Sequence, residues 1–523
     1  MRRTECDAPL MQQGLRKRCM NYTCRLACVP RLRAGGAPMN AAFPRRFCLM
    51  RRASVLLPLL AALAAFPAVG HAADLDGASL SSLWGLPFAG ILLSIAVWPL
   101  VAPKFWHHHY GKIAAGWGLL FLLPFAAAFG THAAVASAVH ALLAEYIPFI
   151  VLIASLYIVA GGICVRGNLH GTPGLNTGIL ALGTLLASFM GTTGAAMLLI
   201  RPLLRANDNR RHVAHVVVFF IFLVANAGGS LTPLGDPPLF LGFLKGVDFF
   251  WTMRNIFPET VFICVVLLAL FYLLDRHYYH NKEEELPPRS DPTPDSGGIA
   301  IEGKFNFVLL LAVIGLVLMS GLWKPGISFD ILGTEVPLQA AVRDALLVVV
   351  AVVSLLVTPQ TARAGNEFNW EPILEVGKLF AGIFLTIIPV IAMLKAGTDG
   401  AFSGVIRAVS DSNGQPVDSM YFWATGLLSS FLDNAPTYLV FFNTAGGDAA
   451  TLMTRDASTL AAISAGAVFM GANTYIGNAP NLMVKAIAEN RGVRMPSFFG
   501  YMLYAGIFLM PLFVIMTFLF FRV

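Results

Sequence analysis

The sequence predicts an all-α polytopic membrane protein built from two inverted repeats of transmembrane helices, each with a re-entrant hairpin and an interrupted helix. Three observations carry this prediction. The 523-residue chain is 57% hydrophobic and only 12% charged, whereas soluble domains carry about 25% charged residues. Apolar runs long enough to span a bilayer recur from residue 83 to residue 521. Finally, two pairs of polar motifs inside these runs repeat at one spacing.

The N-terminal region is expected to be removed or non-native. Residues 50–73 have a basic start, a short apolar stretch and small residues before the first acid, which is the layout of a cleavable signal peptide. A first transmembrane helix is the alternative, but two prolines and the short apolar core disfavour it. Because signals rarely begin so far inside a chain, we expect residues 1–49 to be a non-native or disordered extension, with the true start at Met39 or Met50.

The apolar segments fall into two sets around a hydrophilic stretch. The first set lies at 83–102, 113–130, 146–165, 175–204, 212–227, 237–247 and 253–274. The second lies at 305–323, 341–358, 373–396, 420–443, 458–472, 476–488 and 498–521. We therefore predict a first transmembrane repeat at 83–274, a cytoplasmic linker at 275–304 and a second repeat at 305–523.

Two of these segments, 175–204 and 420–443, are interrupted by polar residues. Arginines flank the first of them on both sides and favour the cytoplasmic face, so a simple span is excluded and a hairpin turning near 191–194 is predicted. The second lies between two loops that are poor in basic residues. It is therefore predicted to be a hairpin that enters from the outside.

The two halves share motifs at a constant offset. "SFMGTTGA" (188–195) aligns with "SFLDNAPT" (430–437), and "GSLTPLGDPPL" (229–239) with "GANTYIGNAPN" (471–481), both at an offset of 242. Two motif pairs at one ungapped offset indicate a duplication. Because the hairpins enter from opposite sides, the repeats are predicted to be inverted, as in secondary transporters whose substrate site lies where the broken helices meet.

The tip of the second hairpin carries Asp433 and Asn434 before Pro436. Proline ends one helix and begins the next, so free carbonyls and free N–H groups lie at such a break. With a carboxylate and an amide, they form an oxygen-rich site suited to Na⁺ or H⁺. The alternative is a simple helix cap, which would not need an acid at membrane depth.

The other breaks supply mostly neutral groups. The tip of the first hairpin offers the hydroxyls of Thr192 and Thr193, with a helix-packing contact as the alternative interpretation. The interrupted segments add Asn226, Thr232, Asp236, Asn473, Thr474 and Asn478. Each half thus contributes one acid, so Asp236 and Asp433 are the Na⁺ candidates. Two carboxylates suit exchange of a cation against protons, because a titratable acid holds one or the other.

Composition excludes several other function classes. No zinc-ligand spacing, dinucleotide fingerprint or Walker motif is present, so we expect no enzyme and no bound cofactor. The net charge of +7 does not indicate nucleic acid, because 12 of the 36 Lys and Arg precede residue 53 and the rest flank apolar segments. Arg201 and Arg205 are expected to anchor the first hairpin at the inner surface, with anion binding as the alternative.

These motifs resemble the ion transporter superfamily that includes arsenite permeases, NhaD-type Na⁺/H⁺ antiporters and citrate–metal symporters. "NAGGSLTPLGDPP" (226–238) is similar to the N-x-G-G-x-x-T-x-x-G-D-P-P signature of that superfamily. "SSFLDNAPT" (429–437) resembles the hairpin of the antiporter branch, and "MLLIRPLLRAN" (197–207) is similar to both NhaD-like antiporters and citrate transporters. The chain departs from the antiporter pattern because the first hairpin and the second interrupted segment carry no acid.

The resemblance implies a multi-pass secondary transporter of the bacterial inner membrane that works by alternating access. Na⁺ or Li⁺ exchange against H⁺ is the expected activity, with the transported Na⁺ and H⁺ as ligands. Symport of citrate or another carboxylate with a cation is the alternative, and arsenite export lacks an identifiable cysteine site. The expected partners are membrane lipid and a second copy of the chain in a homodimer.

Overall fold

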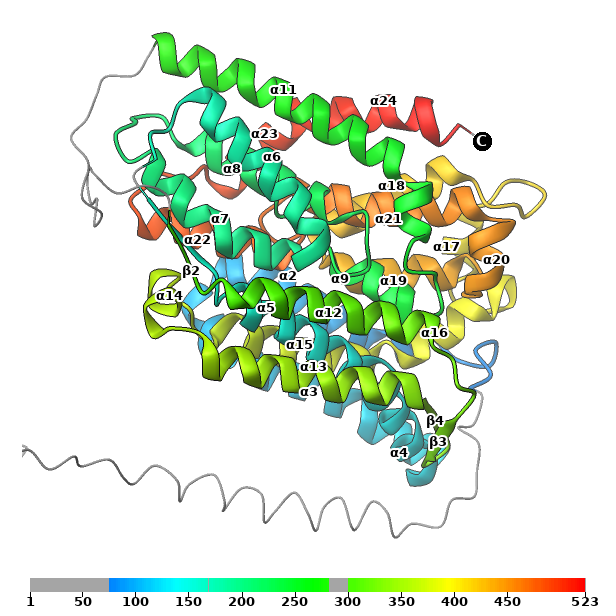
Figure 1. The fold of residues 1–523 in the computed structure, drawn as a ribbon. Helices are drawn as coiled ribbons and strands as arrows, with labels where there is room; N and C mark the ends of the chain where they lie inside the picture. Colours follow the sequence, from blue (N-terminus) through cyan, green and yellow to red (C-terminus); the bar gives the residue numbers. More distant parts are fainter. Residues whose placement is uncertain (1–74, 168, 282–299, 523) are drawn as a thin grey trace, which may run out of the picture. The chain divides into compact units, whose positions relative to one another are not determined.

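A computed structural model of the chain describes residues 75–167, 169–281 and 300–522, which are mainly helical (Figure 1). Besides turns and irregular segments, this part of the chain has two short antiparallel strand pairs. The strand β1 (Cys164–Arg166) pairs with β2 (Ala300–Glu302), and β3 (Ser328–Ile331) pairs with β4 (Thr334–Pro337). The predicted extension at 1–49, the predicted signal peptide at 50–73 and residues 282–299 of the predicted linker lie outside the described residues.

The helices confirm an all-α polytopic membrane protein. Among the described residues, eight helical segments are long and apolar enough to cross a bilayer, and the bent pair α15–α16 makes up to nine. The helices of the first half are η1 (Ser82–Gly85), α2 (Leu86–Val101), α3 (Pro103–Phe129), α4 (Thr131–His140), the π-helical turn η2 (Ala141–Tyr146), α5 (Ile147–Ala160), α6 (Pro173–Met190), α7 (Thr192–Ala206), α8 (Ala214–Leu223), η3 (Ala227–Gly229), α9 (Pro237–Leu244), α10 (Trp251–Asn255) and α11 (Phe257–Asn281).

The second half continues the same alternation of long and broken helices (Figure 1). Its helices are α12 (Phe305–Leu322), α13 (Leu338–Val357), α14 (Gln360–Gly365), α15 (Glu371–Thr386), α16 (Ile388–Lys395), η4 (Gly397–Asp399), α17 (Ser403–Ala408), α18 (Asp418–Phe431), α19 (Asn434–Thr444), α20 (Ala449–Thr454), α21 (Ala457–Met470), η5 (Gly471–Asn473), α22 (Ala479–Asn490), α23 (Phe498–Phe508) and α24 (Met510–Phe520).

Each predicted hairpin consists of two helices that pack against each other across a short break. α6 and α7 are separated by Gly191 alone, which has a φ of +80°. That backbone conformation is readily available only to glycine. α18 and α19 are separated by Leu432 and Asp433, and Asp433 caps α19 by accepting a hydrogen bond from the Ala435 N–H.

The two interrupted helices form the centre of the core. Residues 215–223 of α8 and 459–470 of α21 are buried without exception, so both helices are enclosed by protein on all sides. After each of them the chain runs without regular helix, apart from the short turns η3 and η5, before α9 and α22 begin. Irregular backbone is tolerated at membrane depth only when other protein groups satisfy it, and the buried surroundings of α8 and α21 provide such groups.

The two halves repeat the same hydrogen bonds at the offset of 242. Thr232 Oγ1 donates to the Ser188 carbonyl, and Thr474 Oγ1 donates to the Ser430 carbonyl. α7 and α19 also begin at equivalent positions, as do α9 and α22. The sequence duplication therefore extends to contacts between elements, whereas the inverted orientation of the two repeats stays a prediction.

The helix α11 extends seven residues into the stretch expected to be a linker. Its residue Asp275 is fully buried and accepts hydrogen bonds from Arg210 Nη2 at 2.6 Å and from Asn176 Nδ2 at 3.0 Å. These contacts tie the C-terminal part of α11 to the turn between α7 and α8 and to the start of α6. The charged and polar residues of this stretch led us to expect a linker here, but its first seven residues are helical, and the buried partners of Asp275 stabilise this part of the helix.

Candidate functional site

Asp236 lies at the point where the first interrupted helix resumes. It precedes α9, which begins with Pro237 and Pro238, and its backbone is extended. Proline at the first helical position has no N–H to be capped, and the Asp236 carboxylate makes no capping hydrogen bond to its own helix. With only 1% of the residue exposed, both carboxylate oxygens are directed to groups from other elements.

All four breaks meet at this carboxylate. Asp236 Oδ1 accepts hydrogen bonds from Thr192 Oγ1 at 3.0 Å and from Asn478 Nδ2 at 3.2 Å. Asp236 Oδ2 accepts from Asn434 Nδ2. Thr192 begins α7, Asn434 begins α19 and Asn478 precedes α22. Four of the residues singled out in the sequence therefore form one cluster, called here the Asp236 cluster, which joins both halves.

Asn226 extends the Asp236 cluster further across the halves. Its Nδ2 donates to Asn481 Oδ1 at 2.8 Å, and its Oδ1 accepts from Asn478 Nδ2 at 3.2 Å. All three asparagines are at most 1% exposed. Asn481 lies in the repeated motif but is not among the predicted site residues, and its counterpart at the 242 offset, Leu239, is apolar.

The Asp236 cluster has an unusual electrostatic character for a buried site. The three side chains that donate to Asp236 are a hydroxyl and two amides, so no cation balances the carboxylate. Burial of an unbalanced charge is costly, and such a group normally binds a proton or a cation. Asn434 Oδ1 is also buried and has no hydrogen-bond partner among the described residues. It is therefore an additional oxygen that a cation could use.

Asp433 and Thr193 lie beside the Asp236 cluster rather than inside it. Both residues line a cavity of about 480 Å³, together with Asn478. Asp433 is half-buried, and its Oδ1 accepts from the Ala435 N–H at 3.1 Å. Asn478 belongs to both environments, since it lines the cavity and donates to Asp236. The two predicted acids thus have different surroundings: Asp236 is enclosed and Asp433 faces the cavity.

The cavity connects the cluster to one end of the helices. Along α22 it is lined from the buried Asn478 to the exposed Asn490, a distance of about 18 Å at 1.5 Å per helical residue. The cavity is also lined by α15, which carries Glu371 and Glu375, and by Glu367, which precedes α15. The cavity is therefore rich in carboxylates, which attract cations.

Arg201 lies deeper than expected for a surface anchor. It is 4% exposed and lines the same cavity. Its Nη2 lies 3.3 Å from Glu367 Oε2, whereas Nε and Nη1 are buried without a hydrogen-bond partner among the described residues. Arg205, four residues later, donates to the Val165 carbonyl at 2.6 Å. The two arginines therefore differ, although the sequence suggested the same role for both.

Three of the predicted site residues hold the breaks in place instead of lining the site. Thr232 and Thr474 donate to the carbonyls that end the opposing hairpin helices, and each also accepts from a backbone N–H two residues later at 3.2 Å. Asn473 Nδ2 donates to Ser430 Oγ at 2.9 Å. These contacts fix each interrupted segment against its neighbouring hairpin.

We expect Thr232→Val and Thr474→Val to destabilise the protein by about 1–2 kcal/mol each, because each leaves a buried carbonyl without its donor. The two effects should add, since the sites share no partner. Thermal unfolding of the purified variants in detergent measures this, with Thr454→Val, at an exposed position of α20, as the matched control. Unchanged melting of both buried variants would show that the hydroxyls do not hold the breaks.

The model of the family described as "Putative citrate transport" matches residues 77–521, nearly all of the described part of the chain. No curated protein gives a significant match.

Proposed function

This chain belongs to the citrate-transport family whose model it matches, and from that premise we propose that it exchanges Na⁺ or Li⁺ for H⁺ across the bacterial inner membrane. Membership of the family makes it a secondary transporter with several membrane-spanning helices. The proposal adds the direction of coupling and the identity of the ions, and it assigns the exchange to alternating access of the Asp236 cluster to the two sides.

The observation that carries the proposal is the enclosed carboxylate of Asp236 with purely neutral donors. A carboxylate without a cationic partner can bind a proton or an alkali cation but not both at once, which is the requirement for exchange. Thr192, Asn434 and Asn478 supply hydroxyl and amide groups, whose oxygens are ligands for hard cations once the side chains turn. The acid-rich cavity that ends at Asp433 supports a cation rather than an anion as the ion that enters.

A second candidate function is symport of a carboxylate such as citrate with a cation. The buried Arg201 favours it, because Arg201 lines the cavity and two of its guanidinium nitrogens have no partner among the described residues. Guanidinium groups bind carboxylates through parallel hydrogen bonds. The family description favours it as well, but the three glutamates and Asp433 in the same cavity oppose entry of an uncomplexed tricarboxylate.

Ion pulses on proteoliposomes distinguish the two functions. The purified protein is reconstituted with a trapped pH dye and exposed in turn to Na⁺, Li⁺, K⁺ and citrate. We expect Na⁺ and Li⁺ to drive proton movement, and K⁺ and citrate to have no effect. Arg201→Gln should change the Na⁺ response by less than about threefold, since exchange does not require an anion-binding group.

The matched control is Arg407→Gln, which removes an exposed arginine on α17 that does not line this cavity. Uptake of labelled citrate that is lost in Arg201→Gln and retained in Arg407→Gln, without a Na⁺-driven pH change, would contradict the exchange and establish the symport.

A further inference from the structure

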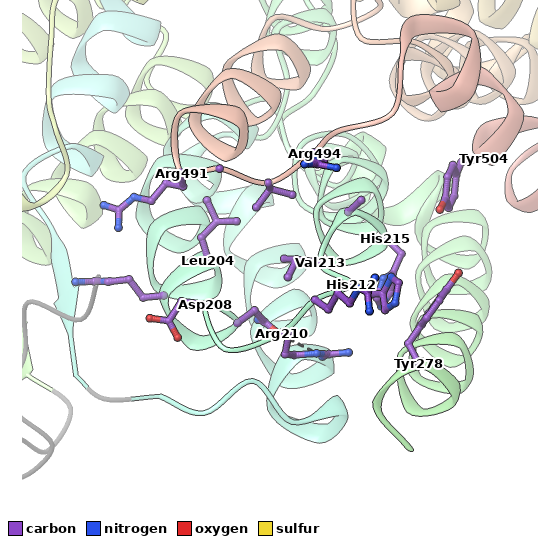
Figure 2. A pocket seen from close by; sticks show the side chains of 16 residues that line it. Leu204, Asp208, Arg210, His212, Val213, His215, Tyr278, Arg491, Arg494 and Tyr504 are labelled. Atoms are coloured by element: carbon purple, nitrogen blue, oxygen red, sulfur yellow. Dashed lines mark hydrogen bonds between the residues drawn. The ribbon is translucent and has the colours of Figure 1, made fainter. Parts of the chain in front are cut away.

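The carboxylate of Glu367 links the linings of two cavities. Glu367 lines the 480 Å³ cavity that reaches Asp433, and its Oε2 accepts a hydrogen bond from Arg201 Nη2 of the same cavity at 3.3 Å. Its Oε1 accepts from Arg491 Nη2 at 3.2 Å. Arg491 lines a second cavity, of about 570 Å³, between the ends of α7, α11 and α22 (Figure 2). One carboxylate therefore joins an arginine of the first half to an arginine of the second.

The backbone of Glu367 has the left-handed conformation, with a φ of +48°. Glu367 follows Asn366, the residue that ends α14. Its N–H donates to the Ala364 carbonyl at 3.0 Å, and the Phe368 N–H donates to the Arg363 carbonyl at 3.0 Å. These two bonds form the Schellman motif that ends many helices, in which glycine usually takes this position. A glutamate is less stable there than a glycine, so the local backbone does not explain this side chain, whereas its contacts with the arginines do.

Arg201 is the more enclosed of the two arginines. It is 4% exposed, and the ion pair with Glu367 is the one that it makes among the described residues. Its Nε and Nη1 remain without a hydrogen-bond partner in this part of the chain. A buried guanidinium with unused donors is costly. Carboxylates are the groups that guanidinium binds through two parallel hydrogen bonds, and Glu367 already occupies one of the three nitrogens.

The position of Glu367 makes it a competitor for any other carboxylate at Arg201. Its side chain is 58% exposed, and exposed ion pairs contribute little to stability. However, the chain holds this carboxylate beside Arg201 at a high effective concentration. Its charge also repels a second carboxylate that approaches the same guanidinium. Both effects disfavour anions from solution and leave cations as the ions that the cavity attracts.

We propose that Glu367 is a selectivity residue of the 480 Å³ cavity. Its carboxylate occupies the place of an anionic ligand at Arg201 and so excludes carboxylates from solution. The inference rests on the proposed cation exchange, because it explains how a cavity with a buried arginine admits a cation. Removal of the Glu367 charge should therefore create a carboxylate-binding site at Arg201.

The test compares the unaltered protein with Glu367→Gln, which removes the charge and keeps the length of the side chain. Isothermal titration calorimetry in detergent measures citrate binding at constant ionic strength. Glu367→Gln should bind citrate at least about tenfold more tightly than the unaltered protein, because the tethered competitor and its charge are both removed. The double variant Arg201→Gln/Glu367→Gln should lose this gain.

The matched control is Glu489→Gln. It removes an exposed carboxylate that pairs with Lys485 and lines neither cavity. This variant should bind citrate like the unaltered protein. Equal citrate binding by the unaltered protein and Glu367→Gln, or a gain that persists in the double variant, would overturn the inference. Glu367→Gly removes the same charge with a residue suited to the positive φ, and it repeats the comparison if Glu367→Gln does not fold.

Transport in proteoliposomes separates failure of this inference from failure of the proposed exchange. Citrate should inhibit Na⁺-driven proton movement by Glu367→Gln and leave that of the unaltered protein unchanged. An unaltered protein that moves no protons in response to Na⁺ would contradict the exchange, while calorimetry would still test the site at Arg201. Exchange by both proteins without inhibition by citrate would contradict the role of Glu367 alone.

Discussion

Asp236→Asn is expected to abolish Na⁺-driven proton movement, lowering its rate on the order of a hundredfold or more. The variant keeps the size of the side chain but removes the charge that binds either ion. Loss of one charged partner in a buried site typically costs about 3–5 kcal/mol, which corresponds to at least a hundredfold in binding. The pH dye in proteoliposomes measures the effect under the same Na⁺ and Li⁺ pulses as for the unaltered protein.

Asp448→Asn provides the matched control for this substitution. Asp448 caps α20, where its carboxylate accepts from the Thr451 N–H at 2.9 Å on the exposed surface. We expect that variant to transport like the unaltered protein. A neutral amide at position 236 is compatible with burial, so we expect the Asp236→Asn protein to remain folded. Thermal unfolding checks this and so distinguishes a loss of transport from a loss of the fold. Full Na⁺-driven exchange by a folded Asp236→Asn protein would remove Asp236 from the mechanism.

Gly235→Ala is expected to destabilise the protein by about 3 kcal/mol or more, which is at the severe end for one substitution. A Cβ atom at position 235 would lie 2.1 Å from the Gly229 carbonyl oxygen and 2.7 Å from its carbon. Both contacts involve backbone, so no side-chain rotation relieves them. The equivalent glycine of the second half, Gly477, would place a Cβ 2.5 Å from the Gly471 carbonyl oxygen.

Gly178→Ala on α6 is the control for the same chemical change. A Cβ there meets no atom within 4 Å, and alanine is favoured over glycine in a helix by up to about 1 kcal/mol. Thermal unfolding in detergent, with size-exclusion chromatography as a check on assembly, measures both variants. If the Gly235→Ala and Gly178→Ala variants unfold at the same temperature, the backbones of Gly229 and Gly235 do not approach each other as closely as described here.

The positions of the breaks could be predicted from the sequence because glycine and proline act locally. Gly191 permits the turn between α6 and α7, and Pro237 begins α9. The motif repeat at the 242 offset then identified the equivalent breaks in the second half. The described structure has helix ends at each of these places, and the repeated threonine contacts follow the same offset.

The partners of each polar side chain could not be predicted, since they depend on how distant segments pack. Asp236 and Asn434 are 198 residues apart in the chain, and no local pattern joins them. Thr192 and Thr232 were equally plausible ligands. Thr192 donates to Asp236, whereas Thr232 donates to a backbone carbonyl. The burial of Arg201 could not be predicted either, because it depends on Glu367 and on the packing of α22 against α7, both remote in the sequence.

Apart from the bond from Thr192 to Asp236, the side-chain hydrogen bonds that join Asp236 and Asn226 to other cluster residues run between the two halves, and this placement gives the site a mechanical role. Asp236 and Asn226 belong to the first half, while Asn434, Asn478 and Asn481 belong to the second. Under alternating access, movement of one half against the other must stretch these bonds. The ion would thus bind at the same side chains that hold the two halves together. Its binding and release would change the strength of the contacts between the halves, so ion binding and conformational change would be coupled without a separate gate.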